Sequence, residues 1–244
     1  ILGTLILALG NLRAILLNDR GSKQHADLNR SFSTEILSGV GNTYEAKRAR
    51  ELADALRDVE IGIDLHATNK PSEPFILCQR LPARYKHVLR WLKAQKVLID
   101  PKMIFAGKPV TLDEYFARDG RMGLCYETGQ AGDTARIYEV HNEIENVLAD
   151  IGMVKSREVL ARTYEDKEIF EFVTSIKLKA LGAFCFASNM GTYNLQPIVA
   201  GEVIGYMHDN PIIVKVDGVL VFPKISELWE VGKPVVYIAR RVEA

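Results

Sequence analysis

The hydrophobic pattern of this chain changes near residue 160, and this change constrains the fold more than any other feature. Up to about residue 151, short apolar runs alternate with segments of helical spacing. After about residue 160, short β-rich runs punctuated by Gly, Asn and Pro take over. The sequence therefore predicts an α/β layer architecture for residues 1–160 and a smaller all-β C-terminal domain, a sandwich or a barrel, for residues 161–244.

Individual segments of the first part show clear periodicity. Amphipathic helices place apolar residues on one stripe, whereas half-buried strands alternate apolar and polar residues. By these criteria the predicted helices are 43–58, 85–96 and 132–153, the last with Asp133 as its N-cap, and the predicted strands are 59–67 and 120–129.

The first ten residues, ILGTLILALG, are almost entirely apolar. They lack the basic start of a signal peptide and are too short to span a bilayer. A parallel strand buried on both faces has this composition, so we expect a strand here. Because the chain starts inside this run and without methionine, we also expect that the natural protein has residues before Ile1.

The overall composition excludes some classes of partner. The 244 residues contain 31 Lys and Arg and 31 Asp and Glu, so no excess of positive charge indicates a nucleic-acid partner. The three cysteines, Cys78, Cys125 and Cys185, are too few and too scattered for a disulfide framework or a four-thiolate zinc site. This predicts a reducing compartment, the cytoplasm, and no association with a membrane.

Polar residues follow two of the predicted strands. His66 ends the strand IGIDL and Glu127 ends GLCY, although 61 positions separate them. Active sites of open α/β sheets lie beyond the carboxyl ends of strands, so these side chains could converge. Imidazole is a good zinc ligand, and a carboxylate beside a metal-bound water is the usual general base. Asp64, on the same face as His66, could fix the ligand imidazole in the second shell.

Asn29 and Arg30 stand together in HADLNRSFS. A guanidinium can grip a carboxylate through two parallel hydrogen bonds, and an adjacent amide adds a donor. Each candidate alone also has an ordinary structural explanation. The Asn29–Arg30 pair could be a turn with a surface charge, His66 a hydrogen-bonded structural residue, and Glu127 a cap of the following turn.

Taken in order, the motifs DLNRSF, DLHATN and YETGQAGD, followed by a β-rich C-terminal part, resemble the succinylglutamate desuccinylase/aspartoacylase family over essentially the whole chain. The resemblance implies the zinc carboxypeptidase fold, with a mixed, largely parallel sheet flanked by helices. It implies that His66 is a zinc ligand, that Glu127 activates the zinc-bound water, and that Asn29 and Arg30 hold the substrate carboxylate. The arginine that polarises the scissile carbonyl would be Arg20; its rival is Arg13.

One departure from the family concerns its first metal motif, H-x-x-E, which does not occur in these 244 residues. His141 and Glu145 have helical spacing instead and predict a solvated helix face. A catalytic zinc normally has three protein ligands and a water. We therefore expect either that H-x-x-E precedes residue 1 or that this is a truncated gene product without metal and activity.

The resemblance implies a zinc-dependent amidohydrolase with one Zn²⁺ per subunit, which removes an acyl group from an N-acylated amino acid or a similar small amide. One alternative is a zinc carboxypeptidase acting on short peptides. The other is a metal-free homologue that only binds carboxylate ligands. An exposed edge strand of the C-terminal part could pair with a second copy and make a homo-oligomer.

Overall fold

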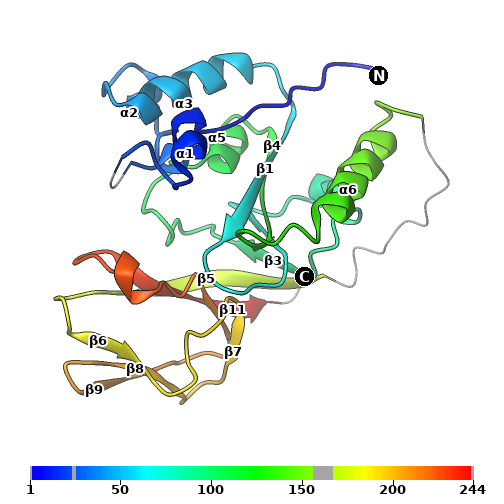
Figure 1. Cartoon of the computed structure of the whole chain (residues 1–244). Coiled ribbons are helices and arrows are strands. Elements are labelled where there is room, and N and C mark those ends of the chain that lie inside the picture. Colours follow the sequence, from blue (N-terminus) through cyan, green and yellow to red (C-terminus); the bar gives the residue numbers. More distant parts are fainter. Residues whose placement is uncertain (1, 24–25, 156–166, 243–244) are drawn as a thin grey trace. The chain divides into compact units, whose positions relative to one another are not determined.

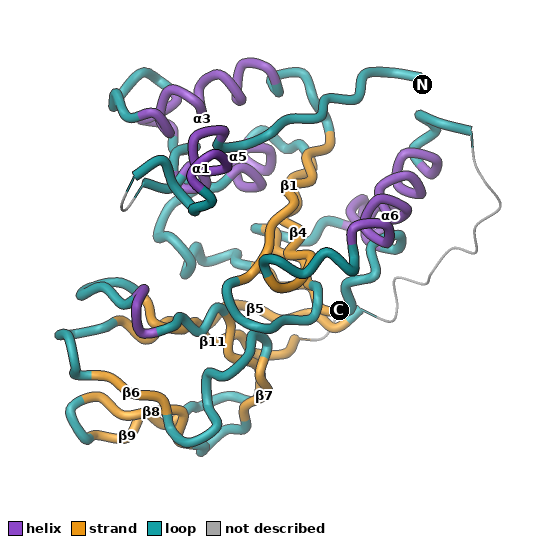
Figure 2. Tube along the Cα trace, viewed as in Figure 1, coloured by secondary structure: helices purple, strands orange, loops and turns teal. Residues whose placement is uncertain are grey.

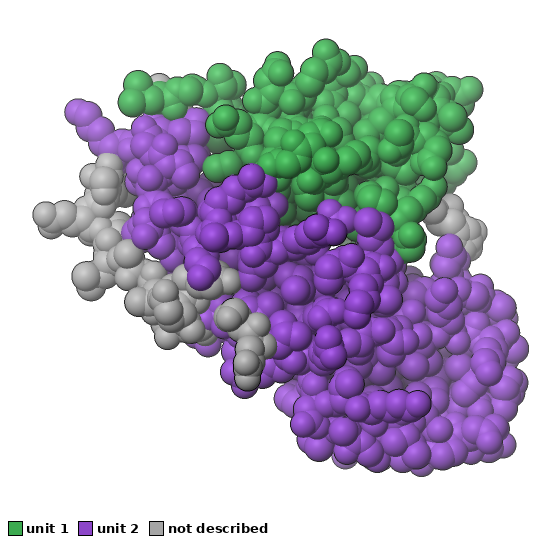
Figure 3. All heavy atoms as spheres, turned by 180° about the vertical axis from the view of Figure 1, so that it is seen from behind, with its two compact units in different colours: residues 1–64, 106–125 green, residues 65–105, 126–244 purple. Residues whose placement is uncertain are grey.

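The computed structural model describes residues 2–23, 26–155 and 167–242. The chain forms two compact units (Figure 3): residues 1–64 with 106–125, and residues 65–105 with 126–244. The division passes through two strands, β1 (Ile61–Thr68) and β4 (Met122–Gln130), each of which contributes residues to both units.

The first unit contains short helices around a small aromatic core. Its longest helix, α3 (Tyr44–Ala55), confirms the helix predicted over 43–58; Thr43 caps it by accepting a hydrogen bond from the Ala46 N–H at 3.1 Å. The other helical elements are α1 (Leu12–Leu17), η1 (Leu28–Arg30), α2 (Thr34–Leu37) and α5 (Leu112–Arg118). They bury a cluster made of Phe32, Ala49, Leu52, Leu56, Tyr115 and Phe116.

The strand predicted over residues 1–10 is wrong for the part that the structure describes. Residues 2–10 belong to neither sheet, and Leu2 and Leu7 are 76% and 85% exposed. The Arg48 guanidinium donates to the carbonyls of Leu9 and Gly10 at 2.7 and 2.9 Å. An apolar run becomes a strand only where a neighbouring strand pairs with its backbone, and in the described residues a side chain takes that place at Leu9 and Gly10.

The main sheet has eight strands in the order β1-β4-β2-β3-β5-β11-β10-β7. Met122 N–H donates to Glu60 O and Ala131 N–H to Thr68 O, both at 2.9 Å, so β4 runs parallel to β1. β2 (Phe75–Cys78), β3 (Lys96–Ile99) and β5 (Glu168–Lys177) are also parallel, whereas β11 (Pro234–Val242), β10 (Gly218–Val221) and β7 (Gln196–Ile198) continue antiparallel. The predicted mixed, largely parallel sheet with helices is confirmed.

The β-rich part contains a second, smaller antiparallel sheet, so of the predicted sandwich or barrel it has the layered form. This sheet consists of β6 (Phe184–Phe186), β8 (Val203–Met207) and β9 (Asn210–Ile213), and it lies opposite β11 in Figures 1 and 2. The two layers share a core that includes Phe184, Ile204, Leu220 and Val236, all at most 4% exposed. A short η4 turn (Ser226–Leu228) connects β10 to β11.

Two predicted helices have different bounds in the structure. Within residues 85–96 the helix is only α4 (Lys86–Leu89), which follows η2 (Ala83–Tyr85), and Lys96 already belongs to β3. The last helix is α6 (Ile137–Asp150), with Arg136 and not Asp133 at its N-cap position. Asp133 instead accepts a hydrogen bond from the Ala135 N–H at 2.9 Å, which stabilises the turn before the helix.

Candidate metal and active site

The register of β1 and β4 brings the two predicted strand-end residues together. The Thr128 hydroxyl donates to the carbonyl of His66 at 2.9 Å, and the Thr68 hydroxyl donates to the carbonyl of Gly129 at 3.2 Å. These bonds set Glu127, the neighbour of Thr128, level with His66. The expected convergence of the imidazole and the carboxylate is therefore found, although 61 positions separate the two residues.

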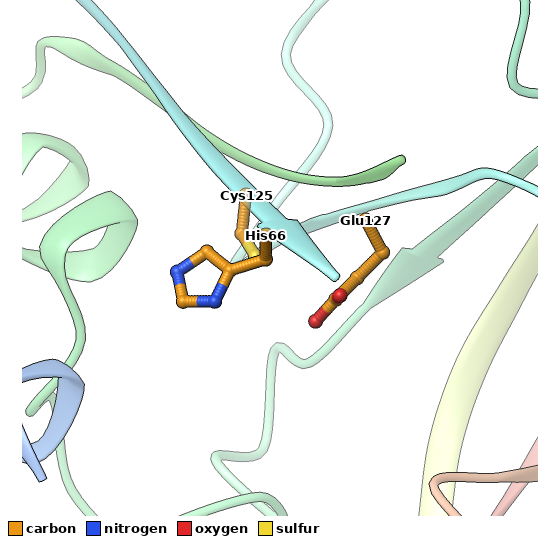
Figure 4. A group of neighbouring side chains, drawn as sticks. All are labelled: His66, Cys125 and Glu127. Atoms are coloured by element: carbon orange, nitrogen blue, oxygen red, sulfur yellow. The ribbon is translucent and has the colours of Figure 1, made fainter. Parts of the chain in front are cut away.

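A third donor, Cys125, lies in the same group. The ligand atoms of His66, Cys125 and Glu127 all lie within 4.8 Å of one another, and Figure 4 shows the three side chains next to each other. Side chains alternate along a strand, so Cys125 and Glu127 share one face of β4. Cys125 and Glu127 are each only 6% exposed.

The intervening residue, Tyr126, points to the other face of β4 and joins it to helix α6. Its hydroxyl donates to Glu143 at 2.7 Å and accepts from Arg136 at 3.3 Å. Burial, followed by the hydrogen bond to Glu143, raises the pKa of Tyr126 above its usual value, so the phenol stays protonated. The buried hydrogen bond between Tyr126 and Glu143 thus connects β4, the strand that carries Glu127, to helix α6.

The three donors fit zinc. Imidazole nitrogen, thiolate sulfur and carboxylate oxygen are the ligand types that zinc takes, and bonds of about 2.0–2.3 Å in a tetrahedron put ligand atoms roughly 3.3–3.8 Å apart. The ligand atoms of the group lie within 4.8 Å of one another, so they would move closer together to reach that spacing. Sequence reasoning missed Cys125; its position two residues before Glu127 on a strand was the available signal.

The predicted substrate-binding residues form one local network in the first unit. Asp27 accepts from the Arg20 guanidinium at 3.1 Å and from the Asn29 N–H at 2.9 Å. The side-chain oxygen of Asn29 accepts from the Leu112 N–H at 2.9 Å, at the start of α5. The Arg30 guanidinium donates to the carbonyl of Asn29 at 2.7 Å. Arg20, Asn29 and Arg30 are therefore held together, and their roles toward a substrate stay predictions.

Arg13 and Asp64 are the two remaining predicted site residues. The Arg13 guanidinium stacks on the Tyr44 ring, 4.3 Å from its centroid. Asp64 lies two residues before His66 on β1, as predicted, and its charge helps to raise the pKa of the buried Asp113. The predicted solvated face of α6 is present, with exposed His141 and Glu145 side chains 3.9 Å apart.

Comparison with known proteins decides the family. The profile of the succinylglutamate desuccinylase/aspartoacylase catalytic domain matches residues 3–149, well over half of the chain. The chain belongs to this family. Curated proteins gave no match.

Solved structures of the family have the same fold. Succinylglutamate desuccinylase from Vibrio parahaemolyticus has a TM-score of 0.73 at 19% identity, covering 96% of this chain and 70% of that one. Murine aminoacylase 3 has a TM-score of 0.70 at 18% identity, covering 96% and 82%. A product-bound ectoine utilization protein from Ruegeria pomeroyi has a TM-score of 0.62 at 16% identity, covering 95% and 73%. Within the described residues, no helix is both long and apolar enough to cross a membrane.

Proposed function

We propose that this chain is a zinc-dependent deacylase that hydrolyses the amide bond of an N-acylated amino acid or a similar small N-acyl amine. The observation that carries the proposal is the pairing of half-buried His66 with buried Glu127 on adjacent strands, in a chain that belongs to a deacylase family. Relatives of the same fold are named as a desuccinylase and an aminoacylase, which supports an acylated amino acid as substrate.

In this proposal Glu127 transfers the proton. Its carboxylate takes a proton from the attacking water and later gives that proton to the leaving amine. His66 would hold the metal, and Asp64, on the same face of β1, would fix the imidazole in the second shell. Zinc, when bound, supplies positive charge that acidifies water and polarises the carbonyl. Burial of Glu127 excludes competing solvent from the proton transfer.

The Asp27-centred network would bind the substrate. Arg30 and Asn29 would orient it through its carboxylate, which converts binding energy into correct placement of the amide. Arg20 would donate to the oxyanion of the tetrahedral intermediate. The hydrogen bonds that Asp27 accepts from the Arg20 guanidinium and the Asn29 N–H support a joint role, because they hold Arg20 and Asn29 beside each other before a substrate arrives.

The test is Glu127→Gln, which keeps the shape of the side chain and removes its ability to accept a proton. We expect kcat to fall about 10²–10⁴-fold with little change in KM, because proton transfer contributes about that much. Acylated amino acids and short peptides should be compared as substrates, since the carboxypeptidase alternative predicts activity only on peptides. The matched control is Glu145→Gln on the exposed face of α6. Near-normal turnover by the Glu127 variant would remove Glu127 from the mechanism.

One observation supports a second candidate function. These 244 residues contain no H-x-x-E, which a binding protein would not need. Such a protein would keep the Asn29–Arg30 pair and bind carboxylates without turnover. Calorimetry with an N-acyl amino acid, run beside the hydrolysis assay, distinguishes the two: binding without product at saturating Zn²⁺ favours the binding protein.

A further inference from the structure

We propose that His66, Cys125 and Glu127 form a metal site of this chain's own, which takes a thiophilic divalent cation through one nitrogen, one sulfur and one oxygen. Among the described residues this is the one group of three or more such side chains whose ligand atoms approach each other so closely. It shares His66 and Glu127 with the proposed catalytic centre, but its occupation by a metal does not depend on hydrolysis. The sulfur donor, Cys125, distinguishes this metal site from the proposed catalytic centre, which does not use it.

Charge balance favours occupation by a divalent cation. Cys125 and Glu127 are almost completely buried. An ionised thiol and an ionised carboxylate this close together repel each other, and in a buried environment that repulsion is costly. A divalent cation with one thiolate, one carboxylate and one neutral imidazole has no net charge, so binding removes that cost.

The donor set also selects the kind of cation. Thiolate and imidazole suit Zn²⁺ and its relatives, whereas Mg²⁺ and Ca²⁺ prefer oxygen donors only. Three protein donors leave a fourth tetrahedral position for a water or another small ligand. The site therefore discriminates between Zn²⁺, Cd²⁺ or Co²⁺ on one side and Mg²⁺ or Ca²⁺ on the other.

Occupation of this site has a consequence for the proposed base. A carboxylate that is bound to a cation through this three-donor set no longer accepts a proton at ordinary pH. The state in which Glu127 is a ligand and the state in which Glu127 is the general base therefore exclude each other.

The experiment uses Co²⁺ as the probe, because a cobalt–thiolate bond gives an intense near-ultraviolet charge-transfer absorption. The metal-free 244-residue chain is titrated with CoCl₂, and Cys125→Ser, Cys185→Ser and Cys78→Ser are titrated in parallel. The controls replace an exposed and a buried cysteine, in β6 and β2, outside the three-donor group. We expect the band in the unaltered chain and both controls, and its loss in Cys125→Ser.

A second variant tests the oxygen donor. Glu127→Gln should keep the thiolate band at saturating Co²⁺ but weaken Co²⁺ binding at least about tenfold. Replacing a residue that only hydrogen-bonds a metal ligand already lowers metal affinity about tenfold or more, so replacing a ligand should lower it at least as much. Excess Mg²⁺ should not displace Co²⁺, whereas Cd²⁺ should. Circular dichroism shows whether each variant is folded.

Three results would overturn the inference: no thiolate band in the unaltered chain, a band that persists in folded Cys125→Ser, or unchanged Co²⁺ affinity in Glu127→Gln. None of them depends on turnover. A chain that binds Co²⁺ through Cys125 and hydrolyses nothing contradicts only the proposed function. A chain that hydrolyses N-acyl amino acids without a thiolate band contradicts only the inference.

Discussion

Asp113 is a buried acidic residue whose environment links stability to pH. It lies in α5 and is 7% exposed; burial, then the nearby carboxylates of Glu114 and Asp64, raise its pKa to about 7. An unfolded aspartate has a pKa of about 4. Between these values the folded state holds a proton that the unfolded state has lost, so the free energy of unfolding falls as pH rises from about 4 to about 7.

We therefore expect Asp113→Asn to flatten this dependence. The free energy of unfolding of the variant, minus that of the unaltered chain, should increase between about pH 4 and about pH 7. Above pH 7 this difference should reach at most about 4 kcal/mol, which is three pH units at about 1.4 kcal/mol each. Urea unfolding at several pH values, with a chelator present, measures it. Asp54→Asn, at an exposed ion pair, is the control. An unchanged slope in Asp113→Asn would show that other groups cause the dependence.

Residue chemistry explains which parts of the site could be predicted. His66 and Glu127 end apolar strands, and parallel strands bring their carboxyl ends to one edge, so the sequence predicted their meeting. Cys125 was missed because a cysteine within an apolar strand has the pattern of an ordinary core residue. Arg20 and Asn29 were predicted individually, but the link through Asp27 depends on backbone geometry within the first unit that no spacing reveals.

At the scale of elements, strand β4 and helix α6 are joined by a buried polar contact. The Tyr126 hydroxyl donates to Glu143, which is 2% exposed. We expect Tyr126→Phe to lower the free energy of unfolding by about 1–3 kcal/mol, because a buried carboxylate loses a donor and gains no water. Chemical denaturation measures this. Tyr138→Phe, 83% exposed on the same helix, should change stability by less than about 0.5 kcal/mol.

The same pair of variants shows whether the contact matters only for folding. If Tyr126 also positions Glu127, kcat of Tyr126→Phe should fall with KM unchanged, and Tyr138→Phe should keep both values. Equal stability of the two variants would contradict the energetic role of the buried hydrogen bond. The expected loss of stability in Tyr126→Phe together with full kcat would limit Tyr126 to a structural role.

Elements with strong periodicity were predicted best. Helix α3 and strand β4 were predicted because most of the apolar residues in their pattern are buried, whereas β1 was predicted although its alternating Leu65 is 52% exposed. The predictions for residues 2–10 and 85–96 were wrong where strand pairing, and not composition, decides the structure. Residues 2–10 have the composition of a strand but no partner strand among the described residues. The predicted helix 85–96 extends too far, since Lys96 pairs with both β2 and β5 as the first residue of β3.

At the largest scale, the predicted division near residue 160 can be examined within the second unit. β5 pairs in parallel with β3 on one side and antiparallel with β11 on the other, so one sheet continues across the predicted boundary. Buried Asn194 adds to this connection. Its N–H donates to the carbonyl of Pro71 at 2.9 Å, and its side-chain oxygen accepts from the Phe222 N–H at 2.7 Å.

This continuity predicts that residues 161–244 are an accessory region that does not fold without the preceding strands. A chain that ends at residue 155 would lack Phe170, Phe172 and Tyr237, which pack with Phe75 and Leu98 in one core, and β3 would lose one of its two partner strands. We expect neither this chain nor residues 161–244 alone to unfold cooperatively, because each exposes half of that core to water. Calorimetry of both fragments and the full chain is the measurement. Two sharp transitions in the separate fragments would instead establish two independent domains, since each fragment would then have a sufficient core of its own.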